Sequence, residues 1–267
     1  MMKKNLITLT IAAIVVLAVL IANMVVSSYS SQQQGKMLNN TAYDNVRVSQ
    51  NFIEKLHSIA TNYSLMEKIG NGTANPQGFL NGSGITLQEQ GKPEVLTISA
   101  DYCPYCAITR WSMIIALMRF GNFTLLHYMT SSASDVWPHT PTFTFYNSSY
   151  KSAFINFTGL ELANNVANPI TNSYSTLDKL NANQIAILKK YDPEEGIPFT
   201  DFGNYSILLG ALGDPSVIQF LNWTTIVQEL QNPNSTVAKE IIGAANIFTK
   251  KICVMINNEA EVCQKLS

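Results

Sequence analysis

The sequence predicts an α/β domain with helical and β-hairpin insertions, preceded by one N-terminal transmembrane helix. Three observations indicate this fold. Residues 6–26 form a long apolar run, and residues 94–99 read as a buried strand that leads through two cysteines into a helix. Two later stretches, each begun by a proline, have the pattern of β-hairpins. The 267 residues, 46% of them apolar, allow an anchor and one domain of about 220 residues.

The charge of the chain gives no indication of a nucleic-acid partner. Only 13% of the residues are charged and the formal net charge is -1. Nucleic-acid binding normally requires clustered basic residues. We therefore expect partners that are not nucleic acids.

Residues 6–26 contain no charged side chain. At a rise of 1.5 Å per residue this run spans about 31 Å, which matches a hydrocarbon core of about 30 Å. A cleaved secretory signal has a shorter apolar core, so we favour an uncleaved anchor. Lys3 and Lys4 precede the run and no Lys or Arg follows it until Lys36. We therefore predict a single-pass protein of the cell membrane, with its N-terminus inside the cell and its domain outside.

The anchor leads into a polar spacer over residues 27–41, which we expect to be a flexible linker. The extracytoplasmic domain is predicted over residues 42–267. Within residues 42–69, apolar side chains recur three and four apart, as on one face of an amphipathic helix. Residues 71–84 are rich in Gly and Asn and predict a loop.

The core is expected to begin with a βαβ unit. Residues 94–99 form its first strand, residues 106–120 its helix, and residues 123–129 (FTLLHYM) its second strand. Hairpins are predicted over residues 141–157, with a turn at 147–150, and over residues 197–209, with a turn at 203–204. Residues 176–191 predict a helix, and residues 131–190 as a whole are assigned to an insertion. Residues 223–230 and 236–251 predict a C-terminal helical extension.

Ten of the 26 asparagines begin an Asn-x-Ser/Thr triplet, where chance would give about four. The triplet is the acceptor for N-glycosylation, so their number predicts a glycoprotein whose domain faces the outside. The candidate acceptors are Asn39, Asn62, Asn71, Asn81, Asn122, Asn147, Asn156, Asn204, Asn222 and Asn234.

Cys103 and Cys106 lie three apart where a strand meets a helix. The N-terminus of a helix stabilises a thiolate, so this position suits a redox-active dithiol. A structural zinc site needs four ligands, and neither the three histidines nor Cys253 and Cys263 provide a second ligand pair at the usual spacing. No metal or other cofactor is therefore expected. A static disulfide between Cys103 and Cys106 remains the other alternative.

The stretch Ala-Asp-Tyr-Cys-Pro-Tyr-Cys, residues 100–106, resembles the active-site turn of the thioredoxin-like superfamily. Its Pro-Tyr dipeptide is usual in glutaredoxins. The continuation to Trp111, residues 135–145 and residues 197–204 resemble an archaeal family of membrane-anchored thioredoxin-like proteins of unknown function. This narrower resemblance covers about residues 42–263, and it implies a thioredoxin-like fold without an established substrate.

The resemblance implies that Cys103 is the attacking thiol and Cys106 the resolving one. It also implies a cis-proline facing the dithiol. We favour Pro198, with Ile197 as the preceding residue that pairs with substrate, because a helix separates it from the βαβ unit. Thr140 and Pro141 are the alternative, but they follow the FTLLHYM strand too closely for a helical crossover.

Other side chains near the turn are given simpler roles. Tyr102 and Tyr105 are expected to form an apolar rim for a polypeptide substrate. Asp101, two residues from Cys103, is near enough to help proton transfer, but we favour a solvated loop acid. Arg110 is a candidate to pair with an acid beneath the site. The side chains expected to be structural are Trp111, His127 and His139.

Cys253 and Cys263 are expected to form a structural disulfide, the alternative being a second redox pair that relays electrons to Cys103 and Cys106. The predicted function is a protein thiol-disulfide oxidoreductase, an oxidase or isomerase. It would act on cysteine-containing protein substrates and exchange electrons with a membrane redox partner. The alternative is a glycosylated cell-surface binding or structural protein on a thioredoxin-like scaffold with static disulfides.

Overall fold

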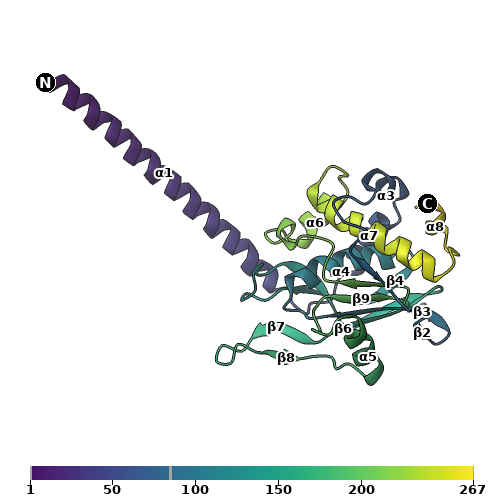
Figure 1. Cartoon of the computed structure of the whole chain (residues 1–267). Coiled ribbons are helices and arrows are strands. Elements are labelled where there is room, and N and C mark those ends of the chain that lie inside the picture. The colour runs from purple at the N-terminus through teal and green to yellow at the C-terminus, as the bar shows by residue number, and fades with distance from the viewer. Residues whose placement is uncertain (1, 84–85, 267) are drawn as a thin grey trace.

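The computed structural model describes the backbone of residues 2–83 and 86–266, with side chains except those of residues 2–13, 31 and 33–39. The fold is mixed α/β, as the sequence predicts (Figure 1). Its helices are α1 (Met2–Thr41), α2 (Gln50–Ala60), α3 (Tyr63–Ile69), α4 (Pro104–Leu117), α5 (Ala182–Tyr191), α6 (Trp223–Leu230), α7 (Thr236–Met255) and α8 (Glu261–Lys265), with a 3-10 turn η1 (Pro215–Val217). Its strands are β1 (Phe79–Asn81), β2 (Gln88–Glu89), β3 (Lys92–Ser99), β4 (Gly121–Thr130), β5 (Pro141–Ser152), β6 (Asn156–Glu161), β7 (Ala163–Ala167), β8 (Tyr174–Thr176), β9 (Phe199–Phe202) and β10 (Ser206–Leu209).

Strand β3 is the centre of the main sheet. It pairs in parallel with β6 on one side and antiparallel with β9 on the other, and β10 and β1 continue the sheet beyond β9. The carboxyl ends of β3 and β6 therefore meet at one edge, where β9 begins and β10 ends. Cys103 and Cys106 follow β3 at this edge.

The two faces of the sheet are covered by different helices. Val95 and Phe202 belong to the large core formed with α4 and α7. Leu96 and Ile98 point to the opposite face, where they pack with Leu188 of α5. This alternation follows from the two-residue period of a strand, and side chains on both faces are buried from Val95 to the end of β3.

The sequence predicts the wrong strand as the parallel partner of β3. Residues 123–129 do form a strand, but this strand, β4, pairs antiparallel with β5 in a separate two-stranded sheet. The parallel partner is β6, so the unit is β3–α4–β6 with the β4–β5 hairpin inserted. The apolar pattern of a strand indicates that the strand is buried, but it does not indicate which other strand pairs with it.

The predicted hairpin over residues 141–157 is also wrong. Strand β5 continues through the expected turn to Ser152, because β4 supplies a long antiparallel partner whose register shifts twice. The chain turns at residues 153–155 and enters β6, which lies within the segment 131–190 assigned to an insertion. That segment is therefore partly central sheet. The hairpin over residues 197–209 is confirmed as β9–β10.

Residues 42–69 form two helices rather than one amphipathic helix. The Ser49 side chain accepts the Phe52 N–H at the start of α2, and the Asn62 side chain accepts the Leu65 N–H at the start of α3. Such caps begin new helices. The predicted helices at 176–191, 223–230 and 236–251 correspond to α5, α6 and α7, and the predicted loop over residues 71–84 contains the short strand β1.

Helix α1 projects away from the rest of the chain (Figure 1). Its backbone stays helical through residues 27–41, where the sequence predicts a flexible linker. The apolar side chains from Ile14 to Val26 are 49–69% exposed. Within the described residues, no helix has the length and apolar character that crossing a membrane requires. The predicted anchor, residues 6–26, extends into residues 6–13, whose side chains lie outside the described part of the chain.

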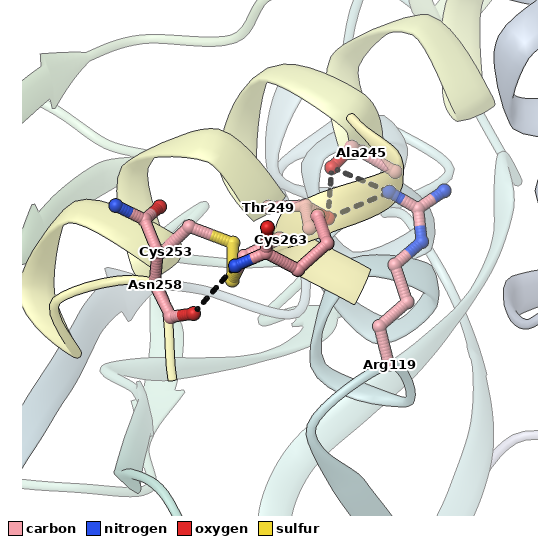
Figure 2. The surroundings of a disulfide bond; sticks show 7 residues. Arg119, Ala245, Thr249, Cys253, Asn258 and Cys263 are labelled. Atoms are coloured by element: carbon pink, nitrogen blue, oxygen red, sulfur yellow. Dashed lines mark hydrogen bonds between the residues drawn. A yellow bond between two sulfur atoms is a disulfide. The ribbon is translucent and has the colours of Figure 1, made fainter. Parts of the chain in front are cut away.

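The C-terminal helices are held together by a disulfide. Cys253 of α7 and Cys263 of α8 are bonded, as the sequence predicts, with their Cα atoms 5.6 Å apart (Figure 2). Nearby, Arg119 donates hydrogen bonds to Ala60 O of α2 and to Thr249 Oγ1 of α7. Burial lowers the pKa of Arg119 to about 9. This side chain therefore joins the segment after α4 to two neighbouring helices.

Candidate functional site

The dithiol turn is organised by Cys103, the N-cap of α4. Its backbone is extended, and its Sγ accepts the Cys106 N–H at 3.1 Å. Pro104 occupies the first helical turn, where a missing N–H breaks no helical hydrogen bond. The sulfur of Cys103 thus lies where the helix presents its free N–H groups, which favour a negative charge.

The two thiols have opposite environments. Both are free, and Cys103 is 6% exposed whereas Cys106 is fully buried. Hydrogen bonds from the Cys106 thiol and N–H, together with the Arg110 charge, hold the pKa of Cys103 below its ordinary value against the effect of burial. Burial raises the pKa of Cys106 well above its ordinary value, and its hydrogen bond to Cys103 adds to this. Cys103 is therefore the better nucleophile, although it is less exposed than a free surface thiol.

A buried ion pair lies beneath the dithiol. Arg110 of α4 is fully buried, and its Nε donates to Glu161 Oε1 at 2.7 Å at the end of β6. Its Nη2 donates to Ala100 O at 2.6 Å. Ser99 Oγ also donates to Glu161, at 2.8 Å. Burial alone would lower the pKa of Arg110, but the Glu161 carboxylate raises it. Glu161 is therefore the acidic partner that the sequence predicts for Arg110.

Asp101 is buried, which corrects its predicted role as a solvated loop acid. It is 1% exposed, and its Oδ1 lies 3.7 Å from Arg110 Nη2 without a hydrogen-bond partner among the described residues. Burial and the neighbouring Glu161 raise the pKa of Asp101 to about 8, against the opposing effect of Arg110. Sequence periodicity did not reveal this burial because β7 covers the turn from a later part of the chain: Asp101 N donates to Ala163 O.

Tyr102 is held by two segments that the sequence did not connect with the site. Its ring stacks on Tyr174 of β8, with centroids 4.3 Å apart. Tyr174 Oη donates to Ser132 Oγ, and Ser132 N donates to Tyr102 O, both at 2.9 Å. Tyr102 is thus half-buried, whereas Tyr105 is 45% exposed. No local pattern indicates Tyr174, because the contact depends on the tertiary placement of β8.

Pro198 lies at the same edge of the sheet as the dithiol. Ile98 is paired with Phe199, which places Pro198 beside Ser99 at the end of β3. The Ile197–Pro198 peptide bond is cis, and it is the only cis bond among the described residues. Pro141, the alternative, begins β5, and its carbonyl accepts the Trp111 Nε1–H.

The remaining predicted residues lie as follows. Trp111 is fully buried in the core. His127 and His139 are partly buried in β4 and the loop before β5, and burial lowers the pKa of each. Among the described residues, no group of three or more His, Cys, Asp or Glu side chains could hold a metal ion.

The candidate glycan acceptors lie on the surface where the structure describes them. Asn39 is outside the residues with described side chains. Asn156 and Asn204 are half-buried, and the Asn204 amide donates to Ser83 Oγ. The others are exposed: Asn62, Asn71, Asn81, Asn122, Asn147, Asn222 and Asn234.

A comparison with protein-family models identifies one match. The family described as a domain of unknown function, DUF929, matches residues 78–254. The chain belongs to the DUF929 family. The DUF929 match includes the main sheet, both site cysteines, the buried charges and Pro198. No curated protein and no solved structure matches the chain.

Proposed function

We propose that this DUF929 protein is a thiol-disulfide oxidoreductase of thioredoxin-like type, working as an oxidase or isomerase on cysteine-containing proteins. One observation carries the proposal: Cys103 caps α4, and its pKa is lowered while that of Cys106 is raised. This asymmetry distinguishes an attacking thiol from a resolving one. The order β3–α4–β6, α5, β9–β10 agrees with the resemblance of the turn to the thioredoxin-like superfamily.

Two exchange steps account for the chemistry. In the reducing direction, the Cys103 thiolate attacks one sulfur of a substrate disulfide, forms a mixed disulfide and releases the other sulfur as a thiolate. Cys106 then attacks Cys103 Sγ, releases the second substrate thiol and forms the Cys103–Cys106 disulfide. Two electrons pass from the dithiol to the substrate, and oxidation of a substrate runs the same steps backwards.

The resolving step needs a proton acceptor, because the pKa of Cys106 is raised. Asp101 is suited to this role. Its own pKa is about 8, so it can take up and return a proton near neutral pH. Burial raises the pKa of the Cys106 thiol, whereas the backbone of the neighbouring Ala100 lowers it. Arg110 bonds Ala100 O and lies beside Asp101, so it holds the acid and the turn together.

We further propose that α1 anchors the domain outside the cell membrane, where it would exchange electrons with a membrane redox partner. The exposed apolar side chains from Ile14 to Val26 support this, because such a surface is unfavourable in water. The surface positions of the candidate glycan acceptors also suit an exterior domain.

The test is a trapped intermediate. The Cys106→Ser variant, mixed with a peptide disulfide, should accumulate a mixed disulfide at Cys103, detected by mass spectrometry and released by reductant. The matched Cys103→Ser variant should form none. The dithiol should also equilibrate with glutathione buffers at a potential between about −270 and −120 mV. If no adduct forms, the redox proposal fails, and a surface binding or structural protein with static cysteines becomes the better interpretation.

A further inference from the structure

The dithiol lies at an edge built from several segments. Residues 99–106 begin at the last residue of β3, residues 162–178 follow β6 and include β7 and β8, and residues 210–219 follow β10. The loop of residues 131–140 joins them through the hydrogen bond from Ser132 N to Tyr102 O. A substrate that reaches Cys103 must therefore contact these segments.

Exposed apolar side chains gather in these segments. Tyr105 is 45% exposed, Val136 64%, Val166 67% and Ile170 91%. A hollow of about 240 Å³ lies between the 131–134 loop and β7, and Val166 lines it. Apolar surface of this kind suits a polypeptide chain better than a small polar thiol.

A half-buried acidic side chain acts on the nucleophile from the neighbouring loop. Asp135, in the 131–140 loop, raises the pKa of both Cys103 and Tyr102. The opposing cation, Arg110, is fully buried and paired with Glu161. Residues 99–106, 131–140, 162–178 and 210–219 contain no lysine or arginine, and the next cation, Lys179, directly follows Asp178. The approach to Cys103 is therefore negative.

The candidate glycan acceptors avoid the same segments. Asn156 begins β6, and Asn81 and Asn204 lie together where β9 turns into β10, at the opposite edge of the sheet. Strand β3, with eight residues, separates the two edges by about 26 Å. Glycans at these positions would leave the dithiol edge open.

We propose that Asp135 and the exposed apolar side chains of these segments form a docking surface for an extended polypeptide segment that carries lysine or arginine beside its cysteine. This inference rests on the proposed thiol-disulfide exchange and adds its substrate class. Asp135 attracts the basic flank and repels acidic thiols, while Val136 and Tyr105 contact the apolar part of the segment.

The experiment compares two probe peptides with the reduced full-length protein in detergent. Both peptides carry one cysteine as a mixed disulfide with 2-thiopyridine, flanked by lysines in one and by glutamates in the other. The Cys103 thiolate attacks the peptide sulfur and releases pyridine-2-thione, which absorbance records. The ratio of the two rate constants is the readout, because any change in Cys103 nucleophilicity affects both peptides alike.

The lysine peptide should react about two- to fivefold faster than the glutamate peptide. This is the effect expected from the attraction or repulsion between Asp135 and a unit charge several ångströms away near a protein surface. Asp135→Asn should bring the ratio close to one, and high salt should do the same. Glu259→Gln, which removes an equally negative exposed side chain beside the amino end of β3, should leave the ratio unchanged. Equal rates in the unmodified protein, or a ratio that Asp135→Asn does not change, would overturn the docking surface. No exchange with either peptide would overturn the proposed function itself.

Discussion

The buried Asp101 carboxyl group lowers the folding stability at neutral pH. Its pKa is raised by burial from an ordinary 3.8 to about 8. Below about pH 4 the Asp101 carboxyl group is largely protonated in both the folded and the unfolded chain, so its ionisation does not lower the free energy of unfolding. As the pH rises from about 4 to 8 the unfolded chain ionises while the folded one does not, and folding stability falls.

Replacement of Asp101 should therefore separate function from stability. We expect Asp101→Asn to slow the attack of Cys106 on the mixed disulfide by about 100-fold, because the proton acceptor is lost. The first step, attack by Cys103, should change much less, and stopped-flow measurement of both steps provides the internal control. Urea unfolding between pH 4 and 8 should show a flatter pH dependence in the variant. An unchanged resolution rate would remove Asp101 from the mechanism.

At the residue scale, the sequence predicts the positions of the two cysteines and of the cis-proline better than the residues that surround them. Cys103, Cys106 and Pro198 could be selected because their local motif and the order of elements restrict them. The burial of Asp101 could not, because Glu161 of β6 and Ala163 of β7 reach it from two later strands. The stacking of Tyr174 on Tyr102 likewise depends on the register of a hairpin 70 residues away in the chain.

At the scale of secondary-structure elements, helices with clear caps were predictable and strand partners were not. Helix α6 is capped by Asn222, whose side chain accepts the Thr225 N–H, and the predicted bounds of the helix are those of the structure. Strand β4 was recognised as a strand and assigned to the wrong sheet. The periodicity of apolar residues indicates which face of a strand is buried. The choice of the partner strand depends on packing between residues that are far apart in the sequence. Gly159 of β6 is an example: a side chain there would collide with Phe145 of β5.

The disulfide between α7 and α8 should stabilise the fold without taking part in exchange. We expect the double variant Cys253→Ser, Cys263→Ser to lose about 2 to 3 kcal/mol of unfolding free energy, since the bond closes a short loop in the unfolded chain. Urea denaturation measures the loss. The single variant Cys103→Ser is the matched control and should change stability much less, because serine can also cap α4. If the double variant loses exchange with a peptide disulfide while it remains folded, a purely structural role is wrong.

At the scale of the whole molecule, hydrogen bonds fix the position of α1 relative to the dithiol edge. The C-terminal end of α1 is fixed to the domain, because Asn40 Nδ2 donates a hydrogen bond to Leu221 O at 2.7 Å. Just after the helix, Asp44 Oδ2 accepts hydrogen bonds from Thr130 and Asn165. Thr130 and Asn165 flank the loop and the hairpin that hold Tyr102. A helix anchored in a membrane would therefore keep the dithiol edge at a fixed distance from the lipid surface.

The anchoring proposal predicts a specific loss of membrane association. Lysine at the centre of a membrane-spanning helix costs about 2.5 to 3.5 kcal/mol, so Val16→Lys together with Leu20→Lys should release the full-length protein into the soluble fraction. The unmodified protein should stay with the membranes after an alkaline carbonate wash. Val254→Lys is the matched control, because Val254 is 56% exposed on α7 and should leave association unchanged. Extraction of the unmodified protein by carbonate would mean that α1 does not span a bilayer, and the redox partner would then have to be sought among soluble proteins.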